Sequence, residues 1–214
     1  MTALDTPQLV AIAAALGWAS GLRLYAVVFL VGLAGTLGWV ELPAGLQLLQ
    51  HPLMLTASGL MLAVEFFADK IPGVDTAWDA VQTFVRIPAG AALAASVFGD
   101  ASAASALAAA ILGGTLAAGS HFAKAGGRVA INASPEPFSN WAASFGEDLA
   151  VGVVLWLAWT HPLVAIAVLA LLVLLTIWLV PRLVRLVGRM FDRLAGLGGV
   201  RAGVAPRDDA EGKA

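Results

Sequence analysis

Apolar residues in this chain come in six long runs, separated by short segments that contain proline, glycine or charged residues. A helix that spans the hydrocarbon of a membrane needs about 20 apolar residues. The sequence therefore predicts six transmembrane helices, placed near 7–37, 51–70, 75–98, 102–124, 138–160 and 162–181. An amphipathic basic helix over 182–197 completes a single transmembrane domain over 1–197, and 198–214 is predicted to be a disordered cytoplasmic tail.

The first run is too long for one straight crossing, and small residues interrupt its middle. Gly17, Ser20 and Gly21 mark a break, and Arg23 follows directly after them. A permanent charge at membrane depth is costly unless it faces the protein interior or water. We therefore expect a broken first helix, with Arg23 at the break and facing inward.

Composition sets the class of protein. The chain is 60% hydrophobic and 12% charged, whereas soluble domains are about half apolar and about a quarter charged. The fold class is thus an all-α polytopic membrane helix bundle. The net charge of −2 gives no case for a nucleic-acid partner, and the absence of cysteine excludes disulfides and thiolate metal sites.

Lys and Arg near the ends of the predicted spans set the orientation. They occur in alternate connections and after the sixth span, at Lys70, Lys124, Arg128, Arg182, Arg185, Arg189 and Arg193. The opposite connections contain none. This alternation predicts a multi-pass protein of the bacterial inner (plasma) membrane with both termini cytoplasmic.

A weak internal repeat accompanies the spans. The second span ends in EFFADK (65–70) and the fourth ends in SHFAKA (120–125). Both hairpins would run the same way through the membrane, as in parallel repeats. The match is short, so chance remains the alternative to a helical-hairpin repeat.

Polar residues form one stripe on each of four spans, at the spacing of a helix face. The stripes are Ser58, Met61, Glu65 and Asp69; Asp75, Asp79, Gln82 and Arg86; Ser120, His121 and Lys124; and Asn140, Ser144, Glu147 and Asp148. All lie in the cytoplasmic half of the membrane or reach its middle. They predict a polar vestibule that opens to the cytoplasm, with Arg86 close to at least one of Glu65, Glu147 and Asp148.

Two sets of candidate residues follow from these stripes. The substrate- or ion-binding set is Arg23, Glu65, Asp79, Arg86, His121, Asn140, Glu147 and Asp148. The gating and loop set is Asp69, Lys70, Asp75, Lys124, Arg128, Asn132 and Glu136. The alternative for the first set is structural ion pairs that fix helix register, and for the second it is solvated caps and topology determinants near the interface.

Three segments resemble a bacterial membrane-protein family catalogued as domain of unknown function 4126. They are ASGLRLYAVVFLVGLAG (19–35), EFFADKIPGVDTAWDAVQTFVRIPAGAALAA (65–95) and HFAKAGGRVAINASPEPFSNWAASFGEDLAV (121–151). The combination of ADKIPGVDTAWD with NASPEPFSNW is the specific part, and the resemblance covers about 8–185. It implies an integral membrane protein and no settled activity.

The sequence favours a small transporter, permease or flippase that is coupled to protons or a cation. Its partners would be membrane lipids and a small-molecule, ion or lipid-phosphate substrate, with a homodimer left open. The alternative is a structural or assembly protein without a substrate, and an intramembrane enzyme comes third. No enzyme motif is found, and we expect no enzyme activity, no cofactor and no metal. A Ser–His or Ser–Lys pair within hydrogen-bond reach would favour the enzyme.

Overall fold

The computed structural model describes residues 4–71, 73–99, 102–132 and 137–202, and the regular structure in them is entirely helical. The helices are α1 (Thr6–Thr36), the short 3₁₀ helix η1 (Ala44–Gln50), α2 (Pro52–Ala68), α3 (Val74–Val97), α4 (Ala103–Asn132), α5 (Pro137–Thr160) and α6 (Pro162–Ala202). Each predicted span starts within one residue of a long helix, which confirms the all-α bundle.

Local chemistry explains why helices start at these positions. The backbone N–H of Gln8 donates to Asp5 Oδ1 over 2.8 Å at the start of α1. His51 Nδ1 accepts from the backbone N–H of Leu53 at 3.2 Å, directly before α2. Proline occupies an early helical position in both helices, where its missing N–H costs nothing.

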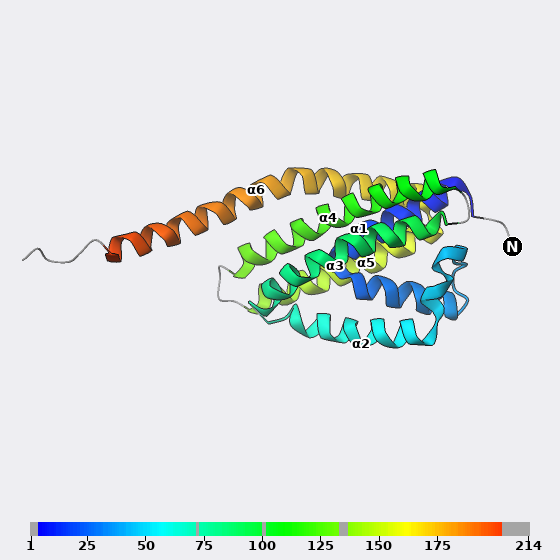
Figure 1. The fold of residues 1–214 in the computed structure, drawn as a ribbon, viewed down its shortest axis with the longest axis horizontal. Helices are drawn as coiled ribbons and strands as arrows, with labels where there is room; N and C mark the ends of the chain where they lie inside the picture. Colours follow the sequence, from blue (N-terminus) through cyan, green and yellow to red (C-terminus); the bar gives the residue numbers. More distant parts are fainter. Residues whose placement is uncertain (1–3, 72, 100–101, 133–136, 203–214) are drawn as a thin grey trace, which may run out of the picture.

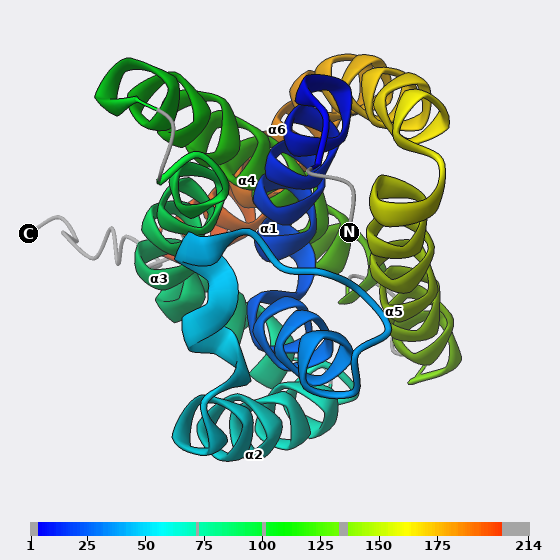
Figure 2. The ribbon, with the colours of Figure 1, turned by 90° about the vertical axis from the view of Figure 1, so that its right-hand side faces the viewer.

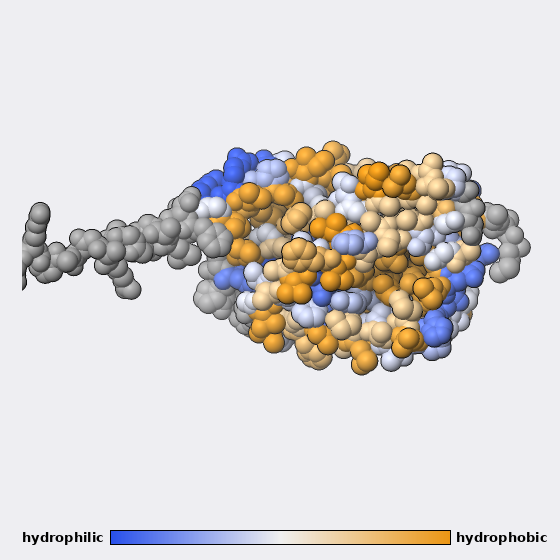
Figure 3. Space-filling model, viewed as in Figure 1, coloured by the Kyte–Doolittle hydropathy of each residue, from blue (hydrophilic) through white to orange (hydrophobic). Residues whose placement is uncertain are grey.

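The bundle has the surface of a multi-pass membrane protein. Five helices are long and apolar enough to cross a membrane, namely α1, α3, α4, α5 and α6, while η1 and α2 qualify together across a bend of 69°. Figure 3 shows mostly apolar residues over the middle of the bundle and hydrophilic residues toward its two ends. Leu53, Phe84 and Leu149 expose at least 69% of their surface, as residues that face lipid do.

The first helix is broken at Arg23, as the sequence predicted. Arg23 has φ −147° and ψ 73°, which separates a first half (6–22) from a second half (24–36). In the first half, Gly17 lies against Gly113 and Gly21 lies against Ala117, so this half runs beside α4. In the second half, by contrast, Gly32 lies against Leu49 and Leu55.

The break reverses the chain and makes α1 a hairpin. The side-chain amide of Gln8, at the start of α1, donates to the carbonyl oxygen of Trp159 over 3.1 Å. The indole N–H of the same Trp159 donates to the carbonyl oxygen of Glu41, just beyond the end of α1, over 3.3 Å. Both ends of α1 therefore lie at one end of the bundle (Figures 1 and 2). Arg23, at which the helix breaks, is the apex. We call the end at Trp159 the outer end, and the end where α2 stops and α3 starts the inner end.

This reversal separates the two described ends of the chain, whereas the sequence predicted both termini on the cytoplasmic side. Thr6 lies at the outer end, whereas α6 starts there and runs about 60 Å toward and beyond the inner end. Thr6 and Ala202 thus lie at opposite ends of the bundle. Counting apolar runs does not reveal the reversal, because it assumes that each run crosses, and α1 returns to the end from which it entered.

The last helix continues further than the sequence suggested. α6 runs through Pro181 without interruption to Ala202, so the basic segment 182–197 continues the sixth span and is not a separate helix. The helix also covers the first residues of the predicted disordered tail, and 203–214 lie outside the described residues. α4 likewise extends to Asn132, beyond its predicted end at 124.

Glycines let α1 approach its neighbours closely. A Cβ added at Gly21 would lie 2.2 Å from the carbonyl oxygen of Ala117, and one at Gly17 would lie 2.5 Å from the Cα of Gly113. Such close contacts between helix backbones are typical of membrane bundles. They bring the apex of α1 against the polar faces of the other helices.

The directions of the helices agree with the predicted repeat. α2 and α4 run from the outer to the inner end, and α3 and α5 return (Figure 1). The two helices of the hairpin α2–α3 make few contacts with one another, and so do those of the hairpin α4–α5. The internal repeat itself stays a prediction.

Candidate functional site

The apex residue Arg23 is fully buried and is shared by three carboxylates. Its Nη1 lies 2.6 Å from Asp69 Oδ2, its Nε lies 3.0 Å from Asp148 Oδ1, and its Nη2 lies 3.6 Å from Glu147 Oε2. Nη2 also donates to the hydroxyl of Ser144 over 2.7 Å. The helix break thus delivers a planar cation to acidic groups from α5 and from the segment after α2.

A second arginine forms the centre of a similar group. Arg86 on α3 pairs with Glu65 on α2, and its Nη1 lies 2.8 Å from Asp79 Oδ1. All three side chains are at most 1% exposed. A buried charge is tolerated only when it is paired. The predicted proximity of Arg86 to Glu65 is confirmed.

Lys124 on α4 joins the two arginine groups. Its Nζ lies 2.7 Å from Asp69, 3.3 Å from Glu147 and 3.6 Å from Asp79. Arg128, one turn further along, pairs with Glu147 at 3.0 Å. We call the connected set the ion-pair network; it consists of Arg23, Glu65, Asp69, Asp79, Arg86, Lys124, Arg128, Glu147 and Asp148.

Three residues of the predicted gating set are instead members of this network. Asp69, Lys124 and Arg128 are at most 5% exposed, so they are not solvated caps, and their gating role stays a prediction. The extension of α4 places Lys124 and Arg128 inside the bundle. Asp69 is drawn inward by Arg23 and Lys124.

Two asparagines link three helices at the inner end. Asn132 Nδ2 donates to Asp75 Oδ1 over 2.8 Å and to Thr76 Oγ1 over 3.0 Å. Asn140 Nδ2 donates to Asn132 Oδ1 over 2.7 Å. These bonds connect the start of α3, the end of α4 and the start of α5. Glu136, the remaining acidic candidate of this region, lies outside the described residues.

His121 is held in one tautomer by its neighbours. Arg86 Nη1 lies 3.3 Å from Nδ1 of His121, and a guanidinium can only donate, so Nδ1 accepts. Nε2 then carries the proton and donates to Thr83 Oγ1 at 2.7 Å. The hydroxyl of Thr83 in turn donates a hydrogen bond to the carbonyl oxygen of Asp79 over 3.0 Å. His121 therefore orients Arg86 in this arrangement.

Lys70 lies beside the network between α2 and α5. Its Nζ is 3.0 Å from the centre of the Phe66 ring and donates to Ser144 Oγ over 3.3 Å. Within the described residues Lys70 makes no ion pair. Ser144 thus accepts from both Arg23 and Lys70.

Side chains of α4 satisfy the carbonyls that the break in α1 leaves free. Lys124 Nζ donates to the carbonyl oxygen of Leu22 over 3.1 Å, and Ser120 Oγ donates to that of Trp18 over 2.7 Å. The last carbonyls of a helix carry partial negative charge, so a cation there is stabilising. Lys124 therefore acts on both the carboxylates and the helix end.

Sequence reasoning left several contact residues out of the candidate sets, although Gln82, Ser120 and Ser144 were on stripes. Tyr25 accepts from Gln82 at 3.3 Å, Thr83 bonds His121, and Ser120 bonds α1. A single hydroxyl on an apolar helix carries no spacing pattern. Only the packing of α1 against α3 and α4 identifies these groups.

The network contains carboxylate oxygens that accept no hydrogen bond. Four cations pair with five carboxylates, and the ammonium of Lys70 lies beside them as a fifth cation. In each of Glu65, Asp69 and Asp79, one carboxylate oxygen accepts no hydrogen bond from the described residues. Chemically, such a group can take up a proton or a monovalent cation.

Access to the network is narrow. Its most exposed members are Asp148 and Glu147 on α5, whose side chains are 32% and 15% exposed. Three hollows on the bundle are lined almost entirely by apolar residues and by no network residue. Among the described residues, no three His, Cys, Asp or Glu side chains are arranged to hold a metal ion. The cytoplasmic vestibule stays a prediction.

Comparison with known proteins places this architecture in a family. The model of a family described as a domain of unknown function, DUF4126, matches residues 10–182. This range contains every residue of the ion-pair network. No curated protein and no solved structure matches the chain. The chain belongs to the family of domain of unknown function 4126.

Proposed function

We propose that this protein is a small membrane transporter, permease or flippase in which the ion-pair network couples transport to a proton or a cation. One observation carries the proposal: a helix hairpin breaks at a buried arginine that is shared by three carboxylates. Transporters commonly build their sites from broken helices whose ends and side chains bind ions.

The way cations are shared supports this function. A purely structural ion pair needs one partner, but Arg23 and Lys124 each contact three carboxylates. A cation with several acceptors can change partner without leaving the protein interior. The carboxylate oxygens without a hydrogen-bond partner supply a place for the coupled ion, and the exposed edge at Asp148 supplies its entry.

Proton flux into liposomes tests the proposal. Purified protein is reconstituted with an internal pH dye, and a membrane potential is imposed with valinomycin and potassium. We expect flux from the wild type and at least a tenfold loss in Arg23→Lys, because lysine keeps the charge but loses the planar fork. Arg182→Gln is the matched control, since Arg182 is exposed and outside the network. A folded Arg23→Lys protein with full flux contradicts the proposal.

A structural or assembly role is the second candidate, and the mutual pairing of the buried charges favours it. Each network cation already has a carboxylate within 3.0 Å, and the three apolar hollows are separate from the network. If the role is structural, replacing Arg86, Glu65 and Asp79 together by apolar residues of similar size would leave a folded protein that still performs its role in the cell. Loss of flux in this triple variant, with its stability retained, argues for transport.

In the part of the chain that the structure describes, one Ser–Lys contact favours an enzyme, the 3.3 Å hydrogen bond from Lys70 to Ser144. A serine nucleophile needs such a base nearby. Against it, Ser144 is 0% exposed and its hydroxyl already accepts from Arg23. A fluorophosphonate probe tests this directly: labelling that disappears in Ser144→Ala would support a hydrolase, and we expect no labelling.

A further inference from the structure

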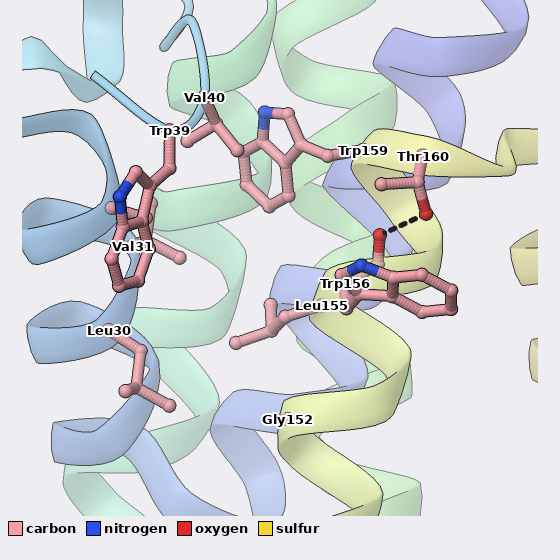
Figure 4. A pocket seen from close by; sticks show the side chains of 10 residues that line it. Leu30, Val31, Trp39, Val40, Gly152, Leu155, Trp156, Trp159 and Thr160 are labelled. Carbon is pink, nitrogen blue, oxygen red and sulfur yellow. Dashed lines mark hydrogen bonds between the residues drawn. The ribbon is translucent and has the colours of Figure 1, made fainter. Parts of the chain in front are cut away.

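An ion that is coupled to transport needs an oxygen with a free lone pair, and three carboxylates of the ion-pair network offer one. Glu65, Asp69 and Asp79 are at most 1% exposed, and each has one oxygen that accepts no hydrogen bond from the described residues. The hollow between the second half of α1 and α5 offers no such oxygen. Indole rings and aliphatic side chains surround it (Figure 4), and no carboxylate of the described residues lines it. The ion-binding residue is therefore sought among the three carboxylates.

These three carboxylates differ in the number of cations that compensate them. Asp69 Oδ2 lies within 2.7 Å of two cations, and Asp79 Oδ1 lies within 3.6 Å of two. Glu65, by contrast, pairs with Arg86 alone among the described residues. A buried carboxylate is costly in its charged form unless it is paired. Glu65 is therefore the least compensated of the three.

The single partner of Glu65 is itself shared. Arg86 Nη2 pairs with Glu65 Oε1, while its Nη1 lies 2.8 Å from Asp79 Oδ1, so one guanidinium serves two carboxylates. Nδ1 of His121 accepts from Arg86, which means that His121 adds no positive charge here. When Glu65 is neutral, Arg86 and Asp79 remain as one cation paired with one carboxylate. Neutral Glu65 thus leaves no buried charge without a partner.

The remaining charged and titratable groups around Glu65 are engaged with other residues. Arg23 on α1 and Lys124 on α4 both pair with Asp69, and within the described ranges neither forms an ion pair with Glu65. The hydroxyl of Tyr25, on the second half of α1, accepts from Gln82 at 3.3 Å. No second cation therefore contacts Glu65 from the described parts of the helices around it.

A proton suits this position better than a metal ion. Metal ions such as Ca²⁺ and Mg²⁺ take about six or more oxygen ligands. In the described part of the chain, no three His, Cys, Asp or Glu side chains are arranged to hold a metal ion. The guanidinium of Arg86 beside Glu65 would also repel a metal cation. A proton needs only one lone pair, which Oε2 of Glu65 provides.

We propose that the coupled ion is a proton and that Oε2 of Glu65 binds it. This inference rests on the proposed function and names the ion of that transporter. The proton forms an O–H bond on Glu65, and Asp79 then balances the charge of Arg86. Because α2 and α3 contact one another at few places, α2 can move away from Arg86 and admit water to Glu65.

Infrared difference spectroscopy on the purified full-length protein tests the proposal. Spectra are compared between about pH 6 and about pH 9, because exposed carboxylates have released their protons above about pH 6. We expect the C=O stretching band of a protonated carboxyl group to grow as the pH falls. Glutamate labelled with ¹³C in its side-chain carboxyl should shift this band, whereas labelled aspartate should not. A band that shifts only with aspartate, or no band in this range, overturns the proposal.

Variants locate the proton within the chain. Glu65→Gln should remove the band and reduce proton flux into liposomes at least tenfold. Glu65→Asp keeps a carboxyl group, so the band should remain and should now shift with labelled aspartate. Glu41→Gln is the matched control, since Glu41 is exposed and outside the network, and it should change neither band nor flux. A band that persists in Glu65→Gln overturns the assignment, as does a band that disappears in Glu41→Gln.

The band is measured without any gradient, so it separates the two proposals. A band assigned to Glu65 without proton flux in liposomes would refute the transporter and keep the proton site. Flux that requires Arg23 but persists in Glu65→Gln would refute this site and keep the transporter. Thermal unfolding of each variant shows whether a lost band reflects a lost fold, and the isotope shift in the wild type depends on no variant.

Discussion

Replacing Arg23 by glutamine tests the centre of the network. The change removes the guanidinium but keeps a polar side chain of similar reach. Asp69 and Glu147 retain Lys124 at 2.7 and 3.3 Å, but among the described residues Arg23 is the one cation paired with Asp148. Asp148 is the carboxylate that loses its partner.

The size of the effect follows from these contacts. Breaking a buried ion pair costs about 3–5 kcal/mol, because the remaining charge is uncompensated. Asp148 is partly exposed, so solvent screening places the cost at the lower end, about 3 kcal/mol. On the scale of soluble domains of this length, that corresponds to a fall in Tm of about 6–12 °C.

Thermal unfolding in detergent, followed by tryptophan fluorescence, is the assay. Adding Asp148→Asn to Arg23→Gln should restore most of the lost stability, with a coupling energy of about 1–3 kcal/mol. Glu65→Gln is the matched control, since Glu65 pairs with Arg86 and not with Arg23. The reasoning is refuted if Glu65→Gln rescues as well as Asp148→Asn, or if neither rescues.

Three further predictions concern topology, packing and the inner end. The chain has no cysteine, so single cysteines at Thr6, Ala44 and Ile71 report sidedness: we expect the first two to label from one side of the membrane and the third from the other, and shared labelling of Thr6 and Ile71 would disprove the hairpin. Gly21→Ala should lower the free energy of unfolding by about 1–3 kcal/mol in chemical denaturation, because its Cβ meets the Ala117 carbonyl oxygen. Gly127→Ala, which meets nothing within 4 Å, should be neutral or stabilising, and equal losses in both would argue against the close helix contact. Asn132→Ala removes hydrogen bonds to Asp75, Thr76 and Asn140 and should cost about 1–3 kcal/mol in the same assay, whereas no change would show that these bonds are not maintained.

The sequence determined the helices and their polar faces. Hydropathy located every long helix to within one residue at its start, because the length of an apolar run is a local property that the hydrocarbon thickness selects. The spacing of Asp79 and Arg86 placed them on one face of α3, and this pair exists in the structure. The small residues before Arg23 indicated the break in α1, since they favour close packing over helix continuity.

Only the tertiary structure decided the direction of the chain after Arg23. A hairpin and a single crossing have the same composition, so hydropathy cannot distinguish them. The distinction appears in contacts between distant residues, above all those that bring Gln8 and Glu41 to Trp159. The sequence could not predict which charges pair for the same reason. It placed Lys124 near the membrane interface, whereas in the structure the longer α4 and the apex of α1 place Lys124 among three carboxylates. Which charges meet depends on how helices pack, and packing is set by contacts that no single span contains.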